Sequence, residues 1–197
     1  MRERGRVLVA LAAAVILVGG GVWWWAARDT APAAVQVPER VCGGTLPGKA
    51  AAALLPKEGD AFREKLDLHF TLPSNRWCSL TSGGTYLDLN YWREPSDSYA
   101  DEMADDPKKP GNTPIQLGEA AGYTSEQAAT LYVSCPSESG RQEHVKVRAA
   151  LQNQAEARSR EPDTDFAELI GDATRHVAKE LDCEGAAKLP SEVPTAD

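Results

Sequence analysis

The chain contains 197 residues, of which 21 are Lys or Arg and 29 are Asp or Glu, so its formal net charge is -8. This length supports one hydrophobic core of ordinary size but not two. The acidic balance disfavours nucleic acid and anionic lipid headgroups as partners, because the field of the protein would repel both.

The N-terminal segment has the features of a membrane span. Residues 7–27 (VLVALAAAVILVGGGVWWWAA) contain no charge, follow Arg2, Arg4 and Arg6, and end close to three tryptophans. As a helix, at about 1.5 Å per residue, the run reaches roughly 31 Å, the thickness of a hydrocarbon core. The basic residues predict that residues 1–6 stay cytoplasmic, that residues 7–27 form a transmembrane helix and that the chain beyond lies outside the cell.

A cleaved signal peptide is the alternative interpretation of this segment. Ala31-Pro32-Ala33 resembles a small-residue cleavage site, although a proline and nearby tryptophans are unusual there. Retention gives a single-pass plasma-membrane protein, and cleavage gives a secreted form of the same domain. Both place the rest of the chain in an oxidising compartment.

The chain after residue 27 is more acidic than the whole, because the first 27 residues hold three arginines and one glutamate. The remainder holds 18 basic and 28 acidic residues, a net charge of -10. Residues 28–40 are rich in Ala and Pro and predict a semi-extended linker. Residues 41–186 are predicted to form one extracytoplasmic domain, and residues 187–197 a disordered tail.

The four cysteines predict two structural disulfides. Cys42, Cys78, Cys135 and Cys183 all lie in the external domain, and none belongs to a CxxC pair. Four cysteines permit three pairings. We favour Cys42 with Cys78 and Cys135 with Cys183, because each bond would tie one helix to one strand.

The first part of the domain predicts a short helix, a strand and a hairpin. Thr45 is a candidate N-cap for a helix that runs through residues 50–55 and ends at Pro56. Residues 66–72 (LDLHFTL) alternate between apolar and polar side chains, as a half-buried strand does. A hairpin with arms 76–80 and 85–92 follows, and the glycines between the arms suit a tight turn.

The second part predicts more strands and a long helix. Residues 96–106 form a polar helix or loop, and residues 115–118, 129–135 and 144–151 are predicted strands. A helix follows, with its N-cap at Asp163 or Thr164 and one apolar stripe of Phe166, Leu169, Ile170, Ala173, Val177 and Leu181. The predicted fold class is α+β, a small antiparallel sheet of about five strands covered on one face by two helices.

Four short patterns carry a resemblance to a known group of proteins. They are Cys42-Gly43-Gly44-Thr45-Leu46, Trp77-Cys78-Ser79-Leu80, Leu117-Gly118-Glu119-Ala120-Ala121 and Leu131-Tyr132-Val133-Ser134-Cys135. The chain resembles actinobacterial exported cell-envelope domains of unknown function, which are membrane- or lipid-anchored and somewhat like the PsbP-type α/β sandwich. The resemblance implies an envelope location and a bond between Cys42 and Cys78, and it implies no reaction. Unlike the lipid-anchored members, this chain has no lipobox cysteine.

The sequence contains no recognisable catalytic, cofactor or metal signature. His69, His144 and His176 are far apart and form no HExxH motif, and GxSxG, SxxK, P-loop and GxGxxG patterns are absent. We therefore predict a non-enzyme without cofactor or metal. An acidic cluster could hold calcium through its carboxylates, but it lacks EF-hand spacing, so a solvated surface is the preferred interpretation. Its members are Asp97, Asp101, Glu102, Asp105 and Asp106.

The best candidate binding residues lie on the second arm of the hairpin. Tyr86, Asp88, Asn90 and Trp92 alternate with apolar residues and so share one face of the strand. Aromatic rings beside amide and carboxylate groups can hold a sugar. The alternative is that these rings pack under the terminal helix or under residues 96–106.

Two classes of function therefore remain. The first is a non-catalytic, membrane-anchored envelope domain that binds a protein or a cell-wall component. The second is a small-ligand or glycan-binding domain that uses the hairpin face. A pocket between sheet and helix would favour the second class, and a filled interior with exposed apolar side chains would favour the first.

Overall fold

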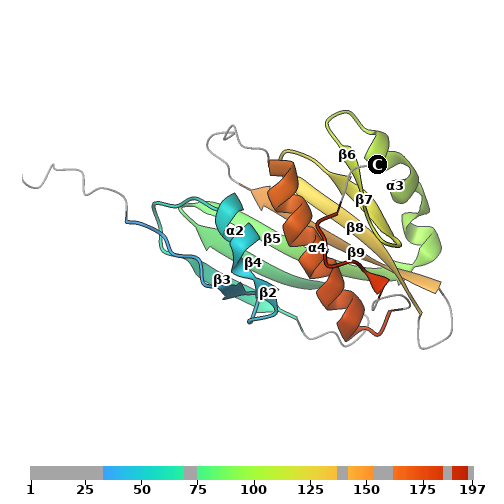
Figure 1. The fold of residues 1–197 in the computed structure, drawn as a ribbon, viewed down its shortest axis with the longest axis horizontal. Helices are drawn as coiled ribbons and strands as arrows, with labels where there is room; N and C mark the ends of the chain where they lie inside the picture. The colour runs from blue at the N-terminus through green and yellow to red at the C-terminus, as the bar shows by residue number, and fades with distance from the viewer. Residues whose placement is uncertain (1–32, 69–74, 137–141, 153–161, 184–187, 195–197) are drawn as a thin grey trace, which may run out of the picture. The chain divides into compact units, whose positions relative to one another are not determined.

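The computed structural model of the chain describes residues 33–68, 75–136, 142–152, 162–183 and 188–194 (Figure 1). The predicted transmembrane helix at 7–27 lies outside these ranges, and no helix within them is long and apolar enough to cross a bilayer. Residues 34–197 form one compact unit. It includes residues 34–40 of the expected linker, where the amide of Val35 donates to the Lys57 carbonyl at 2.8 Å.

The unit is built on a seven-stranded antiparallel sheet with the order β3-β4-β5-β9-β8-β7-β6. The strands are β3 (Arg63–Asp67), β4 (Arg76–Ser82), β5 (Thr85–Pro95), β6 (Thr113–Leu117), β7 (Ala120–Thr124), β8 (Ala128–Pro136) and β9 (Gln142–Gln152). Two further strands, β1 (Arg40–Val41) and β2 (Leu46–Pro47), pair separately. The α+β class is confirmed, but the sheet has seven strands and not about five. The strand absent from the predicted ranges is β7, whose sequence gave no strand pattern.

Helices cover one face of this sheet, as predicted (Figure 1). They are α2 (Gly48–Leu54) and α4 (Pro162–Glu180), and α4 contacts α2, β8 and β9. Every predicted stripe residue of α4 from Phe166 to Val177 is fully buried, which drives the helix onto the sheet. Thr45 does not cap α2: its hydroxyl donates to the Cys42 carbonyl at 2.7 Å, and the N-cap position is Pro47.

The hairpin of β4 and β5 confirms the predicted alternation. Gly83 and Gly84 form its turn with φ of 53° and 79°, values that favour glycine. Leu87 and Leu89 point into the core and are completely buried. The strand expected at residues 66–72 instead begins earlier, as β3, and residues 69–72 of that prediction lie outside the described residues.

Both favoured disulfides are present. Cys42 and Cys78 have Cα atoms 5.6 Å apart, and Cys135 and Cys183 have Cα atoms 4.3 Å apart. The first bond ties the β1–β2 turn, and not a helix, to β4. The second ties β8 to the chain just after α4, as expected. The two disulfides close loops of 36 and 48 residues. In the chain-entropy model each bond stabilises the folded state by about 4 kcal/mol, because it restricts the unfolded chain.

The C-terminal segment differs from the disordered tail that we expected, over the part that the structure describes. The Arg175 guanidinium on α4 donates to the carbonyls of Pro190 and Glu192, at 2.8 and 3.1 Å. Pro194 is buried beside Gly171 of the same helix. Residues 188–194 therefore extend the layer that covers the sheet. The backbone carbonyls of Pro190 and Glu192 belong to no strand or helix, and the Arg175 guanidinium satisfies both of them.

Candidate binding face

The sheet surface opposite α4, which we call the open face, is the candidate functional site. Strand register assigns side chains to it, because residues directly opposite each other on neighbouring strands share a face. Its central members are Arg63, Lys65 and Asp67 of β3, Trp77, Ser79 and Thr81 of β4, Tyr86, Asp88, Asn90 and Trp92 of β5, Lys146, Arg148 and Gln152 of β9, and Thr130 and Tyr132 of β8. The four predicted residues of β5 all lie on it.

Two aromatic side chains are exposed on the part of the open face formed by β4 and β5. Trp77 is 38% exposed and Tyr86 is 42% exposed. Trp77 lies directly opposite Asn90, and Tyr86 lies four residues from Asn90 along β5, about 13 Å at the usual strand rise. The polar groups of Ser79 and Asp88 face each other between them. The two rings therefore flank a polar strip.

Arg148 stands beside this strip on the central strand of the sheet. It lies opposite Asn90 on one side and Thr130 on the other, so Trp77, Asn90 and Arg148 form one row across three strands. Among the described residues none forms an ion pair or a hydrogen bond with its guanidinium. The buried hydroxyl of Thr130 also has no hydrogen-bond partner among them. Arg148 is thus a half-buried cation, and in the described part of the chain its five donors have no acceptor.

Trp92 belongs to a different part of the open face. The Lys146 ammonium lies 5.7 Å from the Trp92 ring centre, 5.5 Å from that of Tyr99 and 5.7 Å from that of Tyr132. It also forms an ion pair with Glu102 of α3 (Ala100–Asp105). Three rings and a carboxylate therefore surround this cation. Because Tyr99 and Glu102 come from the preceding turn and from α3, these two elements cover this end of the open face.

The hydrogen bonds of Tyr132 strengthen the same cluster. The Tyr132 hydroxyl donates to the Glu102 carboxylate at 3.1 Å. Burial, followed by the charge of Glu102, raises the pKa of Tyr132 above its usual range, so the phenol keeps its proton and remains a donor. The structure therefore brings Tyr86, Asp88 and Asn90 together on the uncovered part and places Trp92 at the edge of the covered part.

The acidic residues at 97–106 do not converge on one point. Asp106, in the turn η2 (Asp106–Lys108), forms an ion pair with Lys109 and accepts a hydrogen bond from the Tyr123 hydroxyl at 3.3 Å. The hydrogen bond from Lys109 lowers the pKa of Asp106 below its usual value. Glu102 faces Lys146, and Asp105 faces Lys108 at 3.7 Å. Within the described residues no group of His, Cys, Asp and Glu has the geometry of a metal site.

The histidines are also separate. His69 lies outside the described residues, and His176 is on α4, where burial lowers its pKa. His144 Nε2 lies 3.0 Å from the Ser134 hydroxyl, between neighbouring strands near the end of the sheet. This exposed contact is a surface hydrogen bond.

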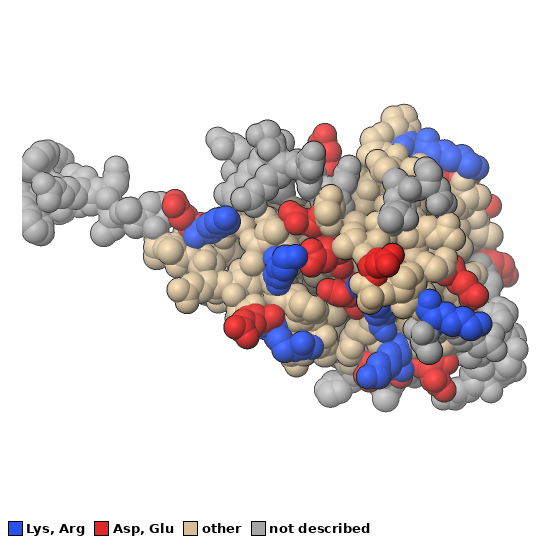
Figure 2. All heavy atoms as spheres, in the orientation of Figure 1, with Lys and Arg blue, Asp and Glu red and all other residues tan. Residues whose placement is uncertain are grey.

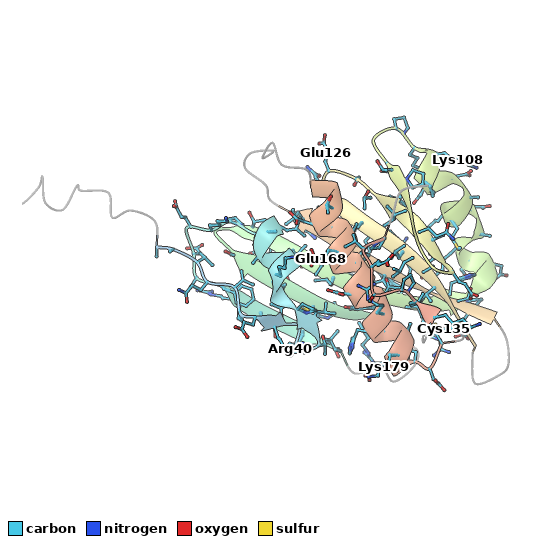
Figure 3. All side chains as sticks on the ribbon, viewed as in Figure 1. Arg40, Lys108, Glu126, Cys135, Glu168 and Lys179 are labelled. Atoms are coloured by element: carbon cyan, nitrogen blue, oxygen red, sulfur yellow. A yellow bond between two sulfur atoms is a disulfide. The ribbon has the colours of Figure 1, made fainter. Side chains whose placement is uncertain are left out.

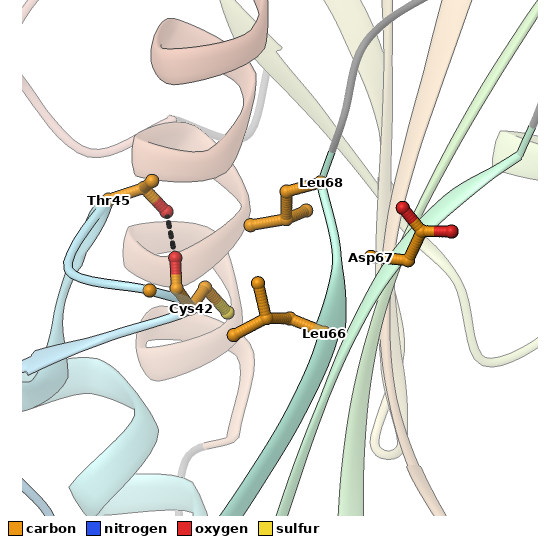
Figure 4. Close-up of a pocket in the computed structure, with 6 residues that line it drawn as sticks. Cys42, Thr45, Leu66, Asp67 and Leu68 are labelled. Carbon is orange, nitrogen blue, oxygen red and sulfur yellow. Dashed lines mark hydrogen bonds between the residues drawn. The ribbon is translucent and has the colours of Figure 1, made fainter.

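A groove of about 560 Å³ lies at the edge of the sheet, between β3 and the turn after β1 (Figure 4). Leu66 and Leu68 point toward Cys42, and Asp67 points away from them. Beside the groove, the Glu64 carboxylate accepts hydrogen bonds from the amides of Cys42 and Gly43, at 2.6 and 2.9 Å. The groove is therefore an edge feature, and the layer between sheet and α4 is filled by buried side chains.

The two faces of the unit differ in charge. Figure 2 views the helix-covered face, on which acidic side chains gather along α4. One of them, Glu168, lies beside α2 and accepts a hydrogen bond from Lys49 at 3.2 Å (Figure 3). On the open face, Arg63, Lys65 and Arg148 have no ion-pair partner among the described residues. The carboxylate near them, Asp88, accepts a hydrogen bond from the neutral Gln152 amide at 2.6 Å.

Sequence reasoning missed Trp77 and Arg148 as site residues. The predicted two-glycine turn could have fixed the hairpin register and so placed Trp77 opposite Asn90. No comparable signal pointed to Arg148, because its place depends on the pairing of strands that are distant in sequence. Comparisons with protein-family models, with curated proteins and with solved structures find no match for this chain.

Proposed function

We propose that this chain is a membrane-anchored, non-catalytic domain that stands outside the cell and binds a protein or cell-wall partner of the envelope through its open face. The observation that carries the proposal is the contrast between the two sheet faces. One is covered by α4, α2 and the C-terminal segment, whereas the other exposes Trp77 and Tyr86 on β4 and β5. Exposed aromatic side chains beside polar groups are typical of binding surfaces.

The proposed location rests on the sequence and on the disulfides. The uncharged run at 7–27 suits a single membrane span with its N-terminus in the cytoplasm. All four cysteines are paired, and structural disulfides persist in oxidising compartments. A secreted form, cleaved after Ala33, would present the same face.

A small-ligand or glycan-binding domain is the second candidate. It is favoured by the proximity of Tyr86, Asp88 and Asn90, to which the structure adds Trp77 on the neighbouring strand. The groove at β3 does not favour an enclosed ligand, because it lies at the sheet edge between a turn and two leucines. A ligand would therefore lie along the open face.

Photo-crosslinking in intact cells of the native host tests the proposal. A photoreactive residue replaces Ser79, which lies on the open face between the two aromatic rings, in the full-length chain. We expect ultraviolet light to join this variant to one recurrent envelope component and to leave the product in the membrane fraction.

The matched control carries the same photoreactive residue at Lys49, which is exposed on α2 at the helix-covered face. We expect no recurrent product from this position. Equal labelling from both positions, or a recurrent product from position 49 alone, would contradict the assignment of the open face.

A further inference from the structure

We propose that the open face binds an acidic polysaccharide, with Arg148 holding a carboxylate of the chain and with Trp77 and Tyr86 stacking on its sugar rings. This inference rests on the proposed function and names the class of its ligand. The juxtaposition that carries it is a guanidinium without a partner among the described residues, beside two exposed aromatic rings on one face of the sheet.

Arg148 has the properties of an anion anchor. A guanidinium presents five donors in a planar fork that matches a carboxylate, and charge-assisted bonds of this kind are strong. Arg148 is held on the central strand and is half-buried, so its donors are partly shielded from water. The neighbouring cation Lys146 already has Glu102 and three rings as partners, whereas Arg148 has no such partner among the described residues.

The polar groups around Arg148 suit sugar hydroxyls. Asn90 lies between Arg148 and Trp77, and its amide can both donate and accept. Ser79 and Asp88 lie opposite each other in the next row, and Gln152 lies opposite Tyr86. A chain of sugars laid along β4 and β5 would meet a ring near each end and hydrogen-bonding groups between them. Tyr86 and Asn90, the residue opposite Trp77, are about 13 Å apart along β5, a distance that spans more than one sugar unit.

Charge favours an acidic ligand at this face although the domain as a whole is acidic. Arg63 and Lys65 project from β3 on the same side as Arg148, and the Asp88 carboxylate of β5, which accepts a hydrogen bond from Gln152, lies between β3 and Arg148. Asp67, the third outward residue of β3, lies 3.7 Å from Arg76. The acidic side chains along α4 are on the other face, and those of α3 lie at the end of the open face that α3 closes, so Arg63, Lys65 and Arg148 would attract a negatively charged polymer to the uncovered part.

The experiment below separates this ligand from an anionic bilayer surface. Trp77 and Tyr86 are each the second residue of their strands, β4 and β5, and Asp88 lies between them. Its carboxylate disfavours an anion at that point, so the anionic groups of the ligand would contact Arg148, Arg63 and Lys65. An added protein strand would pair with the sheet edge at β3 and would leave Arg148 unused.

Binding of the full-length chain, in a nonionic detergent, to polygalacturonate tests the inference. We expect binding to this carboxylated polysaccharide and little binding to its fully methyl-esterified form. Arg148→Gln should weaken binding about tenfold or more, because it removes a charge-assisted pair. Trp77→Ala should weaken it as well. Lys179→Gln, with the same charge change on α4, should not, since Lys179 is exposed on the opposite layer.

A further variant keeps the outcome decisive if Arg148→Gln fails to fold. Arg63→Gln with Lys65→Gln alters only exposed side chains and should also reduce binding. Equal affinity for the charged and esterified polymers, or unchanged binding by these variants, would overturn the inference. Binding to anionic vesicles with the same residue dependence would assign the face to a membrane instead. A recurrent protein crosslink from position 79 without polysaccharide binding would keep the proposed function and remove only this ligand.

Discussion

At the residue scale, the most unusual backbone is the Cys-Gly-Gly turn after β1. Cys42, Gly43 and Gly44 all have positive φ, of 54°, 67° and 79°. A positive φ is unfavourable for Cys42, because its side chain crowds the backbone in this conformation. Two contacts hold Cys42 there: its disulfide with Cys78 and its amide hydrogen bond to Glu64. The resemblance motif is thus a structural device, and Glu64, which no motif indicated, completes it.

Replacing Glu64 by Ala should therefore lower the free energy of unfolding by roughly 1–2 kcal/mol, because two amides lose a charged acceptor at a partly exposed site. Urea denaturation with the disulfides intact measures this. Lys65→Ala, at the adjacent exposed position, is the control and should change stability little. If both variants are equally stable, the carboxylate does not hold the turn.

At the element scale, α3 is attached to the sheet mainly by polar and aromatic contacts. None of its residues is buried, and Glu102 reaches down to Lys146 and Tyr132. Tyr99, in the preceding turn, is buried, with its ring centre 5.6 Å from that of Tyr132. An element with so little buried apolar surface depends on these contacts for its position.

Lys146→Met should loosen α3 and leave the sheet intact. The substitution removes the ion pair and the contacts with three rings, worth roughly 1–3 kcal/mol together, while it keeps the aliphatic stem. Hydrogen exchange of the amides at 100–105 should become faster, and that of β8 and β9 should not. Lys108→Met removes only an exposed pair and should have no such effect. Unchanged exchange at 100–105 in Lys146→Met would show that other contacts dock α3.

Elements with a strong period were predictable from sequence, and elements made by tertiary contact were not. The stripe of α4 and the alternation of β5 were sufficient because burial on one face imposes those periods. β7 was missed because its sequence, AAGYT, has small residues in place of a branched apolar run. The structure explains the glycine: a Cβ at Gly122 would lie 1.9 Å from the Thr130 carbonyl oxygen. β1 and β2, with two residues each, are too short to show a pattern.

The candidate site divides in the same way. The shared face of Tyr86, Asp88 and Asn90 follows from the period of one strand and was predicted. The place of Trp92 agrees with the alternative prediction, in which these rings pack under residues 96–106, because Trp92 shares the Lys146 cation with Tyr99. The sequence did not show that Trp92 would follow the alternative while Tyr86 stays exposed, because Lys146 comes from a distant strand. Arg148 became a candidate only after β9 was seen to be the central strand.

At the scale of the whole molecule, the described unit is a sheet with one covered face and one open face, stapled by disulfides at β4 and at β8. The acidic helix layer and the mixed basic and aromatic face would give a tethered domain a defined binding side. In the proposed orientation a span at 7–27 would confine that side to the envelope.

Radical footprinting of the full-length chain tests this central claim most directly, by comparing intact host cells with the purified protein in detergent. The readout is the oxidation of Trp77 and Tyr86 relative to that of Val193, which is similarly exposed, at 37%, but lies in the C-terminal segment on the α4 side. Our account predicts that both aromatic side chains are protected in cells while Val193 is not. Equal oxidation of Trp77 and Tyr86 in the two states, or protection of Val193 alone, would contradict it.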